Sequence, residues 1–243
     1  PIVPVTVRNS ANYGTVYAAG AALVSASLGG IVGEAYSIVG NVNVVNCANY
    51  GTVRYGWSDG MRLNFGGVVG ASWGNTKVDN VVGTGAFDIE ADKAVVGSVI
   101  GAITSDRDRA TVSGAFWAAG GKYDVAVGQL SVAPPTIVDT ASFDDELTLT
   151  AQVRGTSELV AALNSAAAAA ENRWSRVKYV LSGGPESGKT KSVAAFSKNL
   201  GPIFGGDGLV CKLYRNAART EPYDPSKVTS LDGLVVYQFC EKP

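Results

Sequence analysis

The first 140 residues alternate short β-branched runs with turns rich in Gly and Asn. Runs such as residues 3–7, 42–45 and 78–82 predict short strands, because Val and Ile favour a pleated, half-buried backbone. Polar turn residues separate these runs, and no helical period appears in this stretch. The pattern therefore predicts a mainly β region built from many short strands.

The same stretch repeats itself with a period of 37 residues. Residues 9–16, NSANYGTV, return at 46–53 as NCANYGTV, and residues 29–33, GGIVG, return at 66–70 as GGVVG. Two separated blocks that keep one offset are typical of a stacked-repeat architecture, in which each turn buries its apolar face against the next.

Worn copies of the repeat follow at shorter offsets. Residues 80–87 echo the Asn block at an offset of 34, residues 97–102 echo the Gly block at 31, and residues 112–116 form a fourth echo about 29 further on. We expect Asn9, Asn46 and Asn80 to stack as an interior ladder in which each amide bonds the backbone of the next coil. The alternative is that they are ordinary surface turn residues.

The Gly-Gly-[Ile/Val]-Val-Gly blocks and the Asn-Cys-Ala-Asn-Tyr-Gly-Thr-Val block resemble the GLUG repeat. That repeat occurs in large secreted or cell-surface proteins, including bacterial adhesins and non-catalytic parts of immunoglobulin-degrading peptidases. The family usually has Leu where this chain has Ile31 and Val68. Two clear copies cover residues 5–72, and worn copies extend to about residue 128. The resemblance implies a right-handed β-solenoid at the cell surface, which is a scaffold without catalytic residues.

Pro134-Pro135 marks a boundary, so we predict a β-solenoid domain at residues 1–135 and a smaller α+β region at 136–243. A helix is predicted over about 157–171, with Thr156 or Ser157 as its N-cap. One face of this helix is apolar, and we expect it to cap or flank the C-terminal end of the solenoid. That face carries Leu159, Val160, Leu163, Ala167 and Ala170.

The last part of the chain is predicted to be a small β unit at residues 205–243. Residues 209–214 and 234–240 are strand-like runs separated by a polar loop, which indicates an antiparallel pair. Cys211 and Cys240 lie near the ends of these runs. They form a disulfide if the compartment is oxidising and are free thiols otherwise. Cys47 takes the repeat position of Ser10, which indicates a small buried residue.

Residues 183–190, GGPESGKT, satisfy the pattern of a phosphate-binding loop. They follow a strand-like run and precede a possible helix at 191–200. In a nucleotide site, the loop N–H groups would hold phosphates, Lys189 would reach the β- and γ-phosphates, and Thr190 would hold Mg²⁺.

The context of this loop favours a plain β-hairpin turn. Only 53 residues follow Thr190, and they are rich in Gly, Pro and Asp rather than in the apolar strands of nucleotide-binding folds. ATP or GTP binding through Gly183, Gly188, Lys189 and Thr190 remains the alternative.

The amino-acid composition argues against several classes of function. The chain has 20 basic and 21 acidic residues without a basic cluster, so we expect no nucleic-acid partner. It has no His, which removes the usual neutral-pH general base and the commonest metal ligand, and we expect no cofactor. Acidic residues do not recur in register with the repeat, as a polysaccharide-degrading β-helix enzyme would require. That enzyme class is the second alternative.

The sequence thus favours a non-enzymatic structural or adhesive scaffold. We expect it to be extracellular or on a cell surface, and to be part of a larger or processed protein, because the chain opens at Pro1 without Met or signal peptide. No apolar run is long enough to span a bilayer. The scaffold would act through solenoid faces or end-to-end assembly. Its partners would be a protein or glycan surface ligand, or another copy of itself.

Aromatic side chains set among Gly and polar residues are the candidates for such contacts, because aromatic residues are enriched at interfaces. The alternative is that some of them pack inside or beneath loops. The candidates are Tyr13, Tyr50, Trp57, Trp73 and Trp117.

Overall fold

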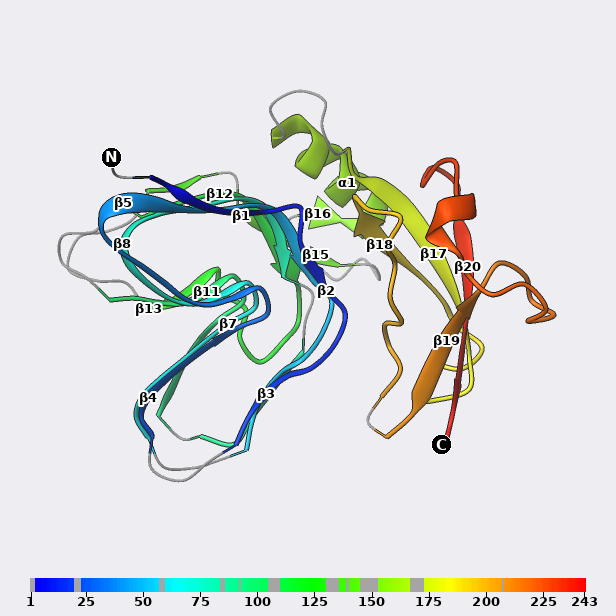
Figure 1. The fold of residues 1–243 in the computed structure, drawn as a ribbon, viewed down its shortest axis with the longest axis horizontal. Helices are drawn as coiled ribbons and strands as arrows, with labels where there is room; N and C mark the ends of the chain where they lie inside the picture. Colours follow the sequence, from blue (N-terminus) through cyan, green and yellow to red (C-terminus); the bar gives the residue numbers. More distant parts are fainter. Residues whose placement is uncertain are drawn as a thin grey trace.

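The computed structural model describes residues 3–19, 23–56, 60–83, 86–91, 93–104, 110–129, 136–138, 140–144, 153–166, 173–206 and 208–243. In this part of the chain the protein is mainly β and has one α-helix, α1 (Gly155–Ala166). Two bodies lie side by side (Figure 1). We call strands β1 to β16 the repeat region and strands β17 to β20 the C-terminal sheet.

The repeat region is built from three sheets whose strands are all parallel. The largest sheet has as its main path β1 (Val5–Arg8), β5 (Val32–Asn49), β8 (Val69–Gly83), β12 (Thr111–Ala118), β15 (Ala141–Asp144) and β16 (Val153–Arg154). Shorter strands join it: β2 (Ala11–Asn12), β11 (Ile100–Ile103), β13 (Val127–Gln129) and β14 (Thr136–Val138).

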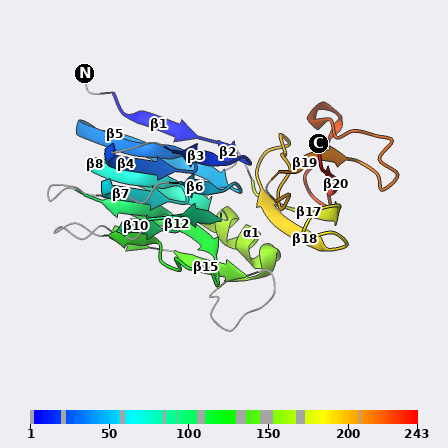
Figure 2. The same ribbon diagram turned by 90° about the horizontal axis from the view of Figure 1, so that it is seen from below.

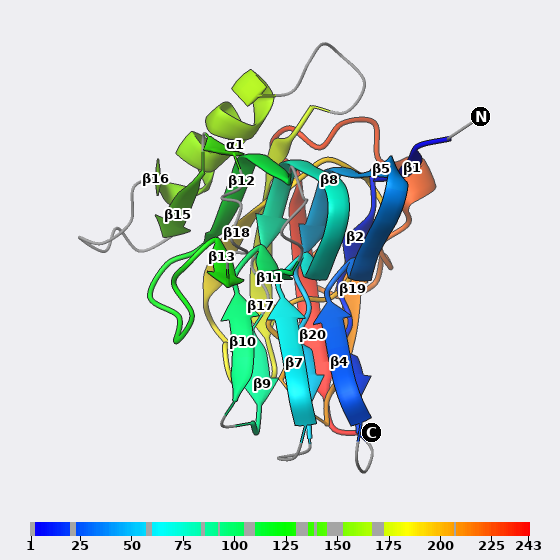
Figure 3. The same ribbon diagram turned by 90° about the vertical axis from the view of Figure 1, so that its left-hand side faces the viewer.

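The two smaller sheets of the repeat region have three strands each. One contains β4 (Leu23–Gly29), β7 (Gly60–Gly66) and β10 (Ala94–Gly97), which lie side by side in Figure 3. The other contains β3 (Val16–Ala18), β6 (Val53–Tyr55) and β9 (Phe87–Ile89). Figure 2 shows that the successive strands from β1 to β15 lie one above another.

Strand register confirms the sequence repeat. In the three sheets Val5 pairs with Val42, Val16 with Val53, and Gly29 with Gly66, and each of these pairs keeps the predicted offset of 37. We therefore call residues 5–41 the first coil and residues 42–78 the second coil.

The later offsets of 34 and 31 are also confirmed, by the pairs Val44–Val78 and Gly66–Gly97. The fourth echo was predicted at the wrong offset. Val112 pairs with Val78, so this copy keeps an offset of 34 instead of about 29. The strand phase is conserved because its side chains must stay in the buried row. In β5 the offset changes from 37 to 34 between Tyr36 and Asn41, where the register with β8 shifts.

The predicted stacking of the three Asn residues is present, but their amides meet one another, and not the backbone of the next coil as expected. Asn46 Nδ2 donates to Asn9 Oδ1 at 2.8 Å, and the Asn80 amide lies 3.1 Å from Asn46 Oδ1. Asn46 and Asn80 are buried, whereas Asn9 is exposed. All three residues have left-handed backbones, with φ of 54°, 53° and 54°, and Gly114 takes the next position with φ of 55°. Asn tolerates this conformation better than most residues. Each coil therefore turns at the same point, and the buried Asn46 amide is placed between those of Asn9 and Asn80.

The Gly blocks mark places where successive coils touch through their backbones. A Cβ added at Gly67 would overlap the Ser98 carbonyl of the next coil. One added at Gly66 would overlap the Val69 carbonyl of its own coil and would lie 2.8 Å from the Gly101 nitrogen of the next coil. Only glycine leaves room for such an approach. The repeated Gly pair is therefore a packing requirement of the stack.

Helix α1 flanks the stack rather than capping its end. It begins at Gly155, so Thr156 and Ser157 lie in its first turn instead of preceding it as predicted, and it is described as far as Ala166. Ala167 and Ala170 lie outside the described residues. Buried Leu159 and Leu163 pack against a row of side chains from successive coils, namely Ala48, Val82, Phe116 and Ala141. This apolar row runs along the side of the stack, and burying it draws the helix there.

The C-terminal sheet has the strand order β18 (Thr190–Ala195), β17 (Ser175–Ser182), β20 (Val235–Glu241), β19 (Val210–Tyr214). The predicted antiparallel pair is confirmed as β19 and β20, while β17 and β20 are parallel. A 3-10 helix, η1 (Pro225–Lys227), lies in the long connection before β20. β14, β15 and β16 still pair with the large sheet, so the stack continues past the boundary suggested by Pro134-Pro135.

Candidate functional site

The loop that matches a phosphate-binding pattern is the turn of a β-hairpin. β17 and β18 pair antiparallel, with Val180 opposite Thr190. The turn between them closes through Gly188 N–H donating to the Leu181 carbonyl at 2.8 Å and Leu181 N–H donating to the Lys189 carbonyl at 2.9 Å. Gly183 and Gly188 have positive φ, which the reversal of the chain requires. The hairpin interpretation is confirmed.

The groups expected to hold a nucleotide have other roles. Lys189 Nζ lies 2.8 Å from a Glu186 carboxylate oxygen, and the hydrogen bond from Lys189 lowers the pKa of Glu186. Thr190 is the first residue of β18, so the possible helix at 191–200 was wrong. Val193 and Ala195 are buried on one side of that strand, and this alternation favours sheet over helix. A phosphate loop needs a helix N-terminus at this point.

Cys211 and Cys240 form a disulfide that joins β19 to β20. They are directly opposite in the register of the two strands, with Cα atoms 4.1 Å apart. Cys47 is a free, fully buried thiol in the core of the repeat region, and burial raises the pKa of its thiol. The disulfide is therefore confined to the C-terminal sheet.

Tyr13 and Tyr50 contact the C-terminal sheet. Their rings occupy equivalent places in the first and second coils and stack with centroids 5.0 Å apart. The Tyr50 hydroxyl donates to the Ala194 carbonyl of β18, and Tyr13 packs into the core of the C-terminal sheet. Burial raises the pKa of both hydroxyls. These two rings join the repeat region to the C-terminal sheet. They therefore pack inside the molecule, which was the alternative to an external contact in the sequence analysis.

Trp117 is also engaged within the molecule. Its indole packs against the large core of the repeat region, and its Nε1 donates to an Asp124 carboxylate oxygen at 2.6 Å. Trp57 lies outside the described residues. Of the four predicted contact aromatics that the structure describes, Trp73 is the one left on the outer surface of the stack, with 37% of its area exposed.

Trp73 has an exposed partner that sequence reasoning missed. Tyr36 pairs with Trp73 in the register of β5 and β8 and is 59% exposed. The two ring centroids lie 6.3 Å apart, with their planes inclined by 39°. Their neighbours Ala35 and Ser72 are buried, so the two rings point outward. The signal was present, because Tyr36 precedes Trp73 by the period of 37 residues. We call Tyr36 and Trp73 the aromatic pair.

The chain bulges outward directly after the aromatic pair. The register of β5 and β8 shifts between Tyr36 and Asn41, and Gly74 has a φ of 94°. Val39, on the bulge, is 65% exposed. Bulges redirect side chains and are frequent next to functional sites. The aromatic pair thus lies next to a bulge that also exposes the apolar side chain of Val39.

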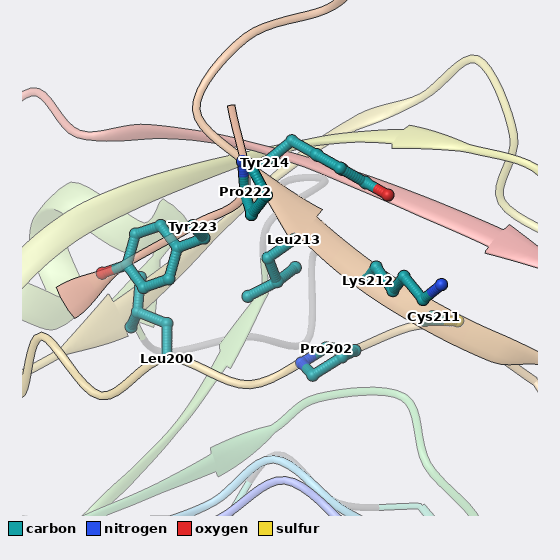
Figure 4. A pocket seen from close by; sticks show the side chains of 8 residues that line it. All are labelled: Leu200, Pro202, Cys211, Lys212, Leu213, Tyr214, Pro222 and Tyr223. Atoms are coloured by element: carbon teal, nitrogen blue, oxygen red, sulfur yellow. The ribbon is translucent and has the colours of Figure 1, made fainter. Parts of the chain in front are cut away.

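A shallow groove of about 510 Å³ opens beside β19 in the C-terminal sheet (Figure 4). Leu213 forms its floor, and the side chains of Leu200, Pro202 and Tyr223 lie around it. The Tyr223 hydroxyl donates to the Lys198 carbonyl at 2.7 Å. Lys212 is the one charged residue that lines the groove, and Tyr214 and Tyr223 add polar groups to a lining that is otherwise mostly apolar.

The described residues hold no cluster of three or more Cys, Asp or Glu side chains placed to bind a metal ion. Among them, no helix has the length and apolar character that a membrane crossing requires. Comparisons of the chain with protein-family models, curated proteins and solved structures give no match. The exposed aromatic pair, the groove beside β19 and the disulfide are therefore the features from which a function can be inferred.

Proposed function

We propose that the chain is a non-enzymatic scaffold of a secreted or cell-surface protein, whose GLUG-type repeats form a right-handed β-solenoid. The scaffold binds a protein or glycan on another surface through its outer wall, or assembles through its end. The location outside the cytosol is supported by the disulfide, because disulfides persist mainly in oxidising compartments.

The aromatic pair is the observation that supports ligand binding through the outer wall of the stack. Two large rings in equivalent positions of adjacent coils remain exposed, at 59% for Tyr36 and 37% for Trp73. Aromatic side chains supply much of the binding energy at interfaces because they bury a large area with few rotatable bonds. An exposed apolar patch rimmed by polar residues marks an interaction site more often than an accident of folding.

The stack makes this pair a rigid contact. Tyr36 and Trp73 are fixed by the parallel pairing of β5 and β8, and the Asn ladder holds the same two coils in register. A pre-organised surface loses little conformational entropy on binding. Two rings about one sugar unit apart suit stacking against a glycan chain, and they suit apolar side chains of a protein equally.

The test is binding of the purified chain to cells, and to the same cells after treatment with periodate or with protease. Loss of binding after periodate identifies a glycan ligand, and loss after protease identifies a protein ligand. The Tyr36→Ala, Trp73→Ala double variant should bind roughly tenfold more weakly or worse. Tyr17→Ala is the matched control, because Tyr17 is also exposed, at 57%, but lies on a different sheet. Equal binding of the double variant and the parent would end the proposal for the wall.

A further inference from the structure

The C-terminal sheet has one buried face and one open face. Along β17 and β20, buried residues alternate with residues that are half-buried or exposed. The buried residues form the core of this sheet, and Tyr13 and Tyr50 of the repeat region pack against that core. We call the opposite side of β17, β20 and β19 the outer face. These three strands are labelled at the right of Figure 1.

Three aromatic side chains lie together on the outer face. Tyr214 and Tyr237 are directly opposite each other in the register of β19 and β20. Phe239 is two residues further along β20, so the alternation of a strand places it on the same face. All three side chains are half-buried. Because neighbouring strands lie about 4.8 Å apart, these rings form one continuous platform.

Basic side chains lie on the same face as these rings. Lys212 is opposite Phe239 in the register of β19 and β20, and Arg176 and Lys178 lie on the outer side of β17. All three basic side chains are exposed. Strands β17, β19 and β20 contain a single acidic residue, Glu241. The outer face is therefore basic, although the whole chain has a net charge of −1.

A further cation reaches the outer face from the loop that follows β19. The guanidinium carbon of Arg219 lies over the Phe239 ring, 4.1 Å from its centroid. Arg219 has a left-handed backbone with a φ of 59°, which is uncommon for a residue other than Gly or Asn. Asn216 holds this turn, because its carbonyl accepts the Arg219 N–H at 3.2 Å and its amide oxygen accepts the Thr220 N–H at 3.1 Å.

This arrangement suits a ligand that has both rings and acidic groups. A guanidinium over a ring keeps N–H donors at the edge of its plane, where they can bind two oxygens of a carboxylate or a sulfate. Lys212 adds a second cation on the other side of the same ring's register position. Tyr214 and Tyr237 offer apolar ring faces together with hydroxyl groups, which match the C–H and O–H groups of a sugar.

We infer that the outer face binds an acidic glycan, a polysaccharide that carries carboxylate or sulfate groups. Arg219 and Lys212 bind the acidic groups, and the rings stack against the sugars between them. This inference goes beyond the scaffold function proposed above, because it assigns a ligand class to a second surface that does not include the aromatic pair.

Other acidic polymers match the outer face less well. A nucleic acid carries a phosphate on every unit and needs a basic surface that follows its backbone, whereas this chain has 20 basic and 21 acidic residues. An acidic peptide would add to a sheet edge or bury apolar side chains in a groove, and the rings here lie on the flat side of a sheet. A glycan separates its acidic groups by sugar rings, as the cations here are separated by aromatic rings.

Titration calorimetry with four polymers tests this inference. The probes are heparin as a sulfated glycan, polygalacturonate as a carboxylated glycan, dextran as a neutral glycan and polyglutamate as an acidic peptide. We expect the parent chain to bind heparin or polygalacturonate, more weakly as salt is added, and not to bind dextran or polyglutamate. The acidic glycan that binds more tightly identifies the preferred acidic group.

Variants of the two cations locate the site. The Arg219→Gln, Lys212→Gln double variant should bind the acidic glycan at least about tenfold more weakly than the parent. Arg219→Lys keeps the charge but loses the planar group, so its affinity should lie between these two. Arg62→Gln is the matched control, because Arg62 is also exposed but lies on β7 of the repeat region, and it should bind like the parent.

The result can fail independently of the wall proposal. The Tyr36→Ala, Trp73→Ala variant should bind the acidic glycan as tightly as the parent does. Absence of binding to both acidic glycans, or binding that the double variant leaves unchanged, would overturn the inference. Equal binding of polyglutamate would also overturn it, because the outer face would then recognise acidic groups on a peptide as well as on a glycan.

Discussion

The repeat region and the C-terminal sheet are both β structure, but different contacts hold them together. In the repeat region each strand pairs with its equivalent in the next coil, and the same Asn and Gly positions recur at each step. In the C-terminal sheet the neighbours β17 and β20 come from distant parts of the chain. There a disulfide joins β19 to β20, and the buried Gln238 amide bonds both backbone groups of Ile203.

This difference predicts how each region responds to damage. A stack is stabilised by a sum of nearest-neighbour contacts. A substitution in one coil therefore weakens mainly that coil and the coils next to it. A small mixed sheet with one core loses stability as a unit, because its pairs form only when distant segments meet.

Removing the disulfide should destabilise the C-terminal sheet by about 3–4 kcal/mol, because it frees a loop closed by a bond between residues 29 apart. The Cys211→Ala, Cys240→Ala variant should lose hydrogen-exchange protection throughout β17 to β20, while β5 and β8 keep theirs. Cys47→Ala is the control for loss of a Cys side chain in the other region. Equal loss of protection in both regions would show that they unfold together and would remove the contrast.

Replacing Gly66 by Ala should cost about 3 kcal/mol, because the new Cβ overlaps the Val69 carbonyl and neither backbone has room to retreat. Gly121→Ala is the matched control, since no atom lies within 4 Å of its added Cβ, and it should stay within about 0.5 kcal/mol of the parent. Denaturant unfolding measures both. Exchange should increase in β7 and β10 and leave β20 unchanged. Comparable stability of the two variants would mean that the coils do not approach as closely as described.

The sequence predicts the repeat region better than the C-terminal sheet for the same physical reason. A repeat displays its own register, so the pairing of Val5 with Val42 and the Asn ladder follow from the offset alone. The aromatic pair could have been predicted in the same way, because Tyr36 precedes Trp73 by one period of the repeat. Pairing of β17 with β20 has no local signal, since it depends on how a long connection folds back.

The sequence of a strand also does not indicate which other element packs over its outward-facing side chains. Ala48, Val82 and Phe116 point out of the stack, and they are buried only because α1 and Trp174 lie over them. Tyr13 and Tyr50 were predicted as external contacts from their setting among Gly and polar residues, yet the same setting suits a ring that meets another part of the chain. Gly and polar residues around an aromatic residue indicate that its side chain lies outside the core of its own coil. Whether it then contacts solvent, a partner or another part of the chain depends on tertiary packing.

Replacing Asn46 should separate the two contributions that a ladder residue makes. Asn46→Ala loses the amide bonds to Asn9 and Asn80 and places Ala at a φ of 53°, for a combined cost of about 2 kcal/mol. Asn46→Gly loses the same bonds without the backbone strain, so it should cost about 1 kcal/mol less than the Ala variant. Gly114 already occupies the equivalent position with the same φ. Thermal and denaturant unfolding of both variants measures the difference, and equal stabilities would assign the whole effect to the amide bonds.

The contact between the two regions gives the smallest expected effect and a pH dependence. Tyr50→Phe removes the hydrogen bond to the Ala194 carbonyl and should cost about 1 kcal/mol near neutral pH. Burial raises the pKa of Tyr50 well above the ordinary value of 10.0, so the folded state keeps a proton that the unfolded state releases. The stability from this protonated group is complete below about pH 10 and falls as the pH rises further.

Because Tyr13 and Tyr179 share this raised pKa, the parent should lose stability steeply in alkali. The free energy of unfolding of Tyr50→Phe should fall less steeply with pH, by about one proton, because one linked group has been removed. Tyr17→Phe, at an exposed position, should keep the parent's slope. Parallel slopes for the parent and Tyr50→Phe would mean that the Tyr50 hydroxyl reaches solvent in the folded state. In that case the repeat region and the C-terminal sheet would be joined by the ring contacts of Tyr13 and by α1, and not by the Tyr50 hydrogen bond.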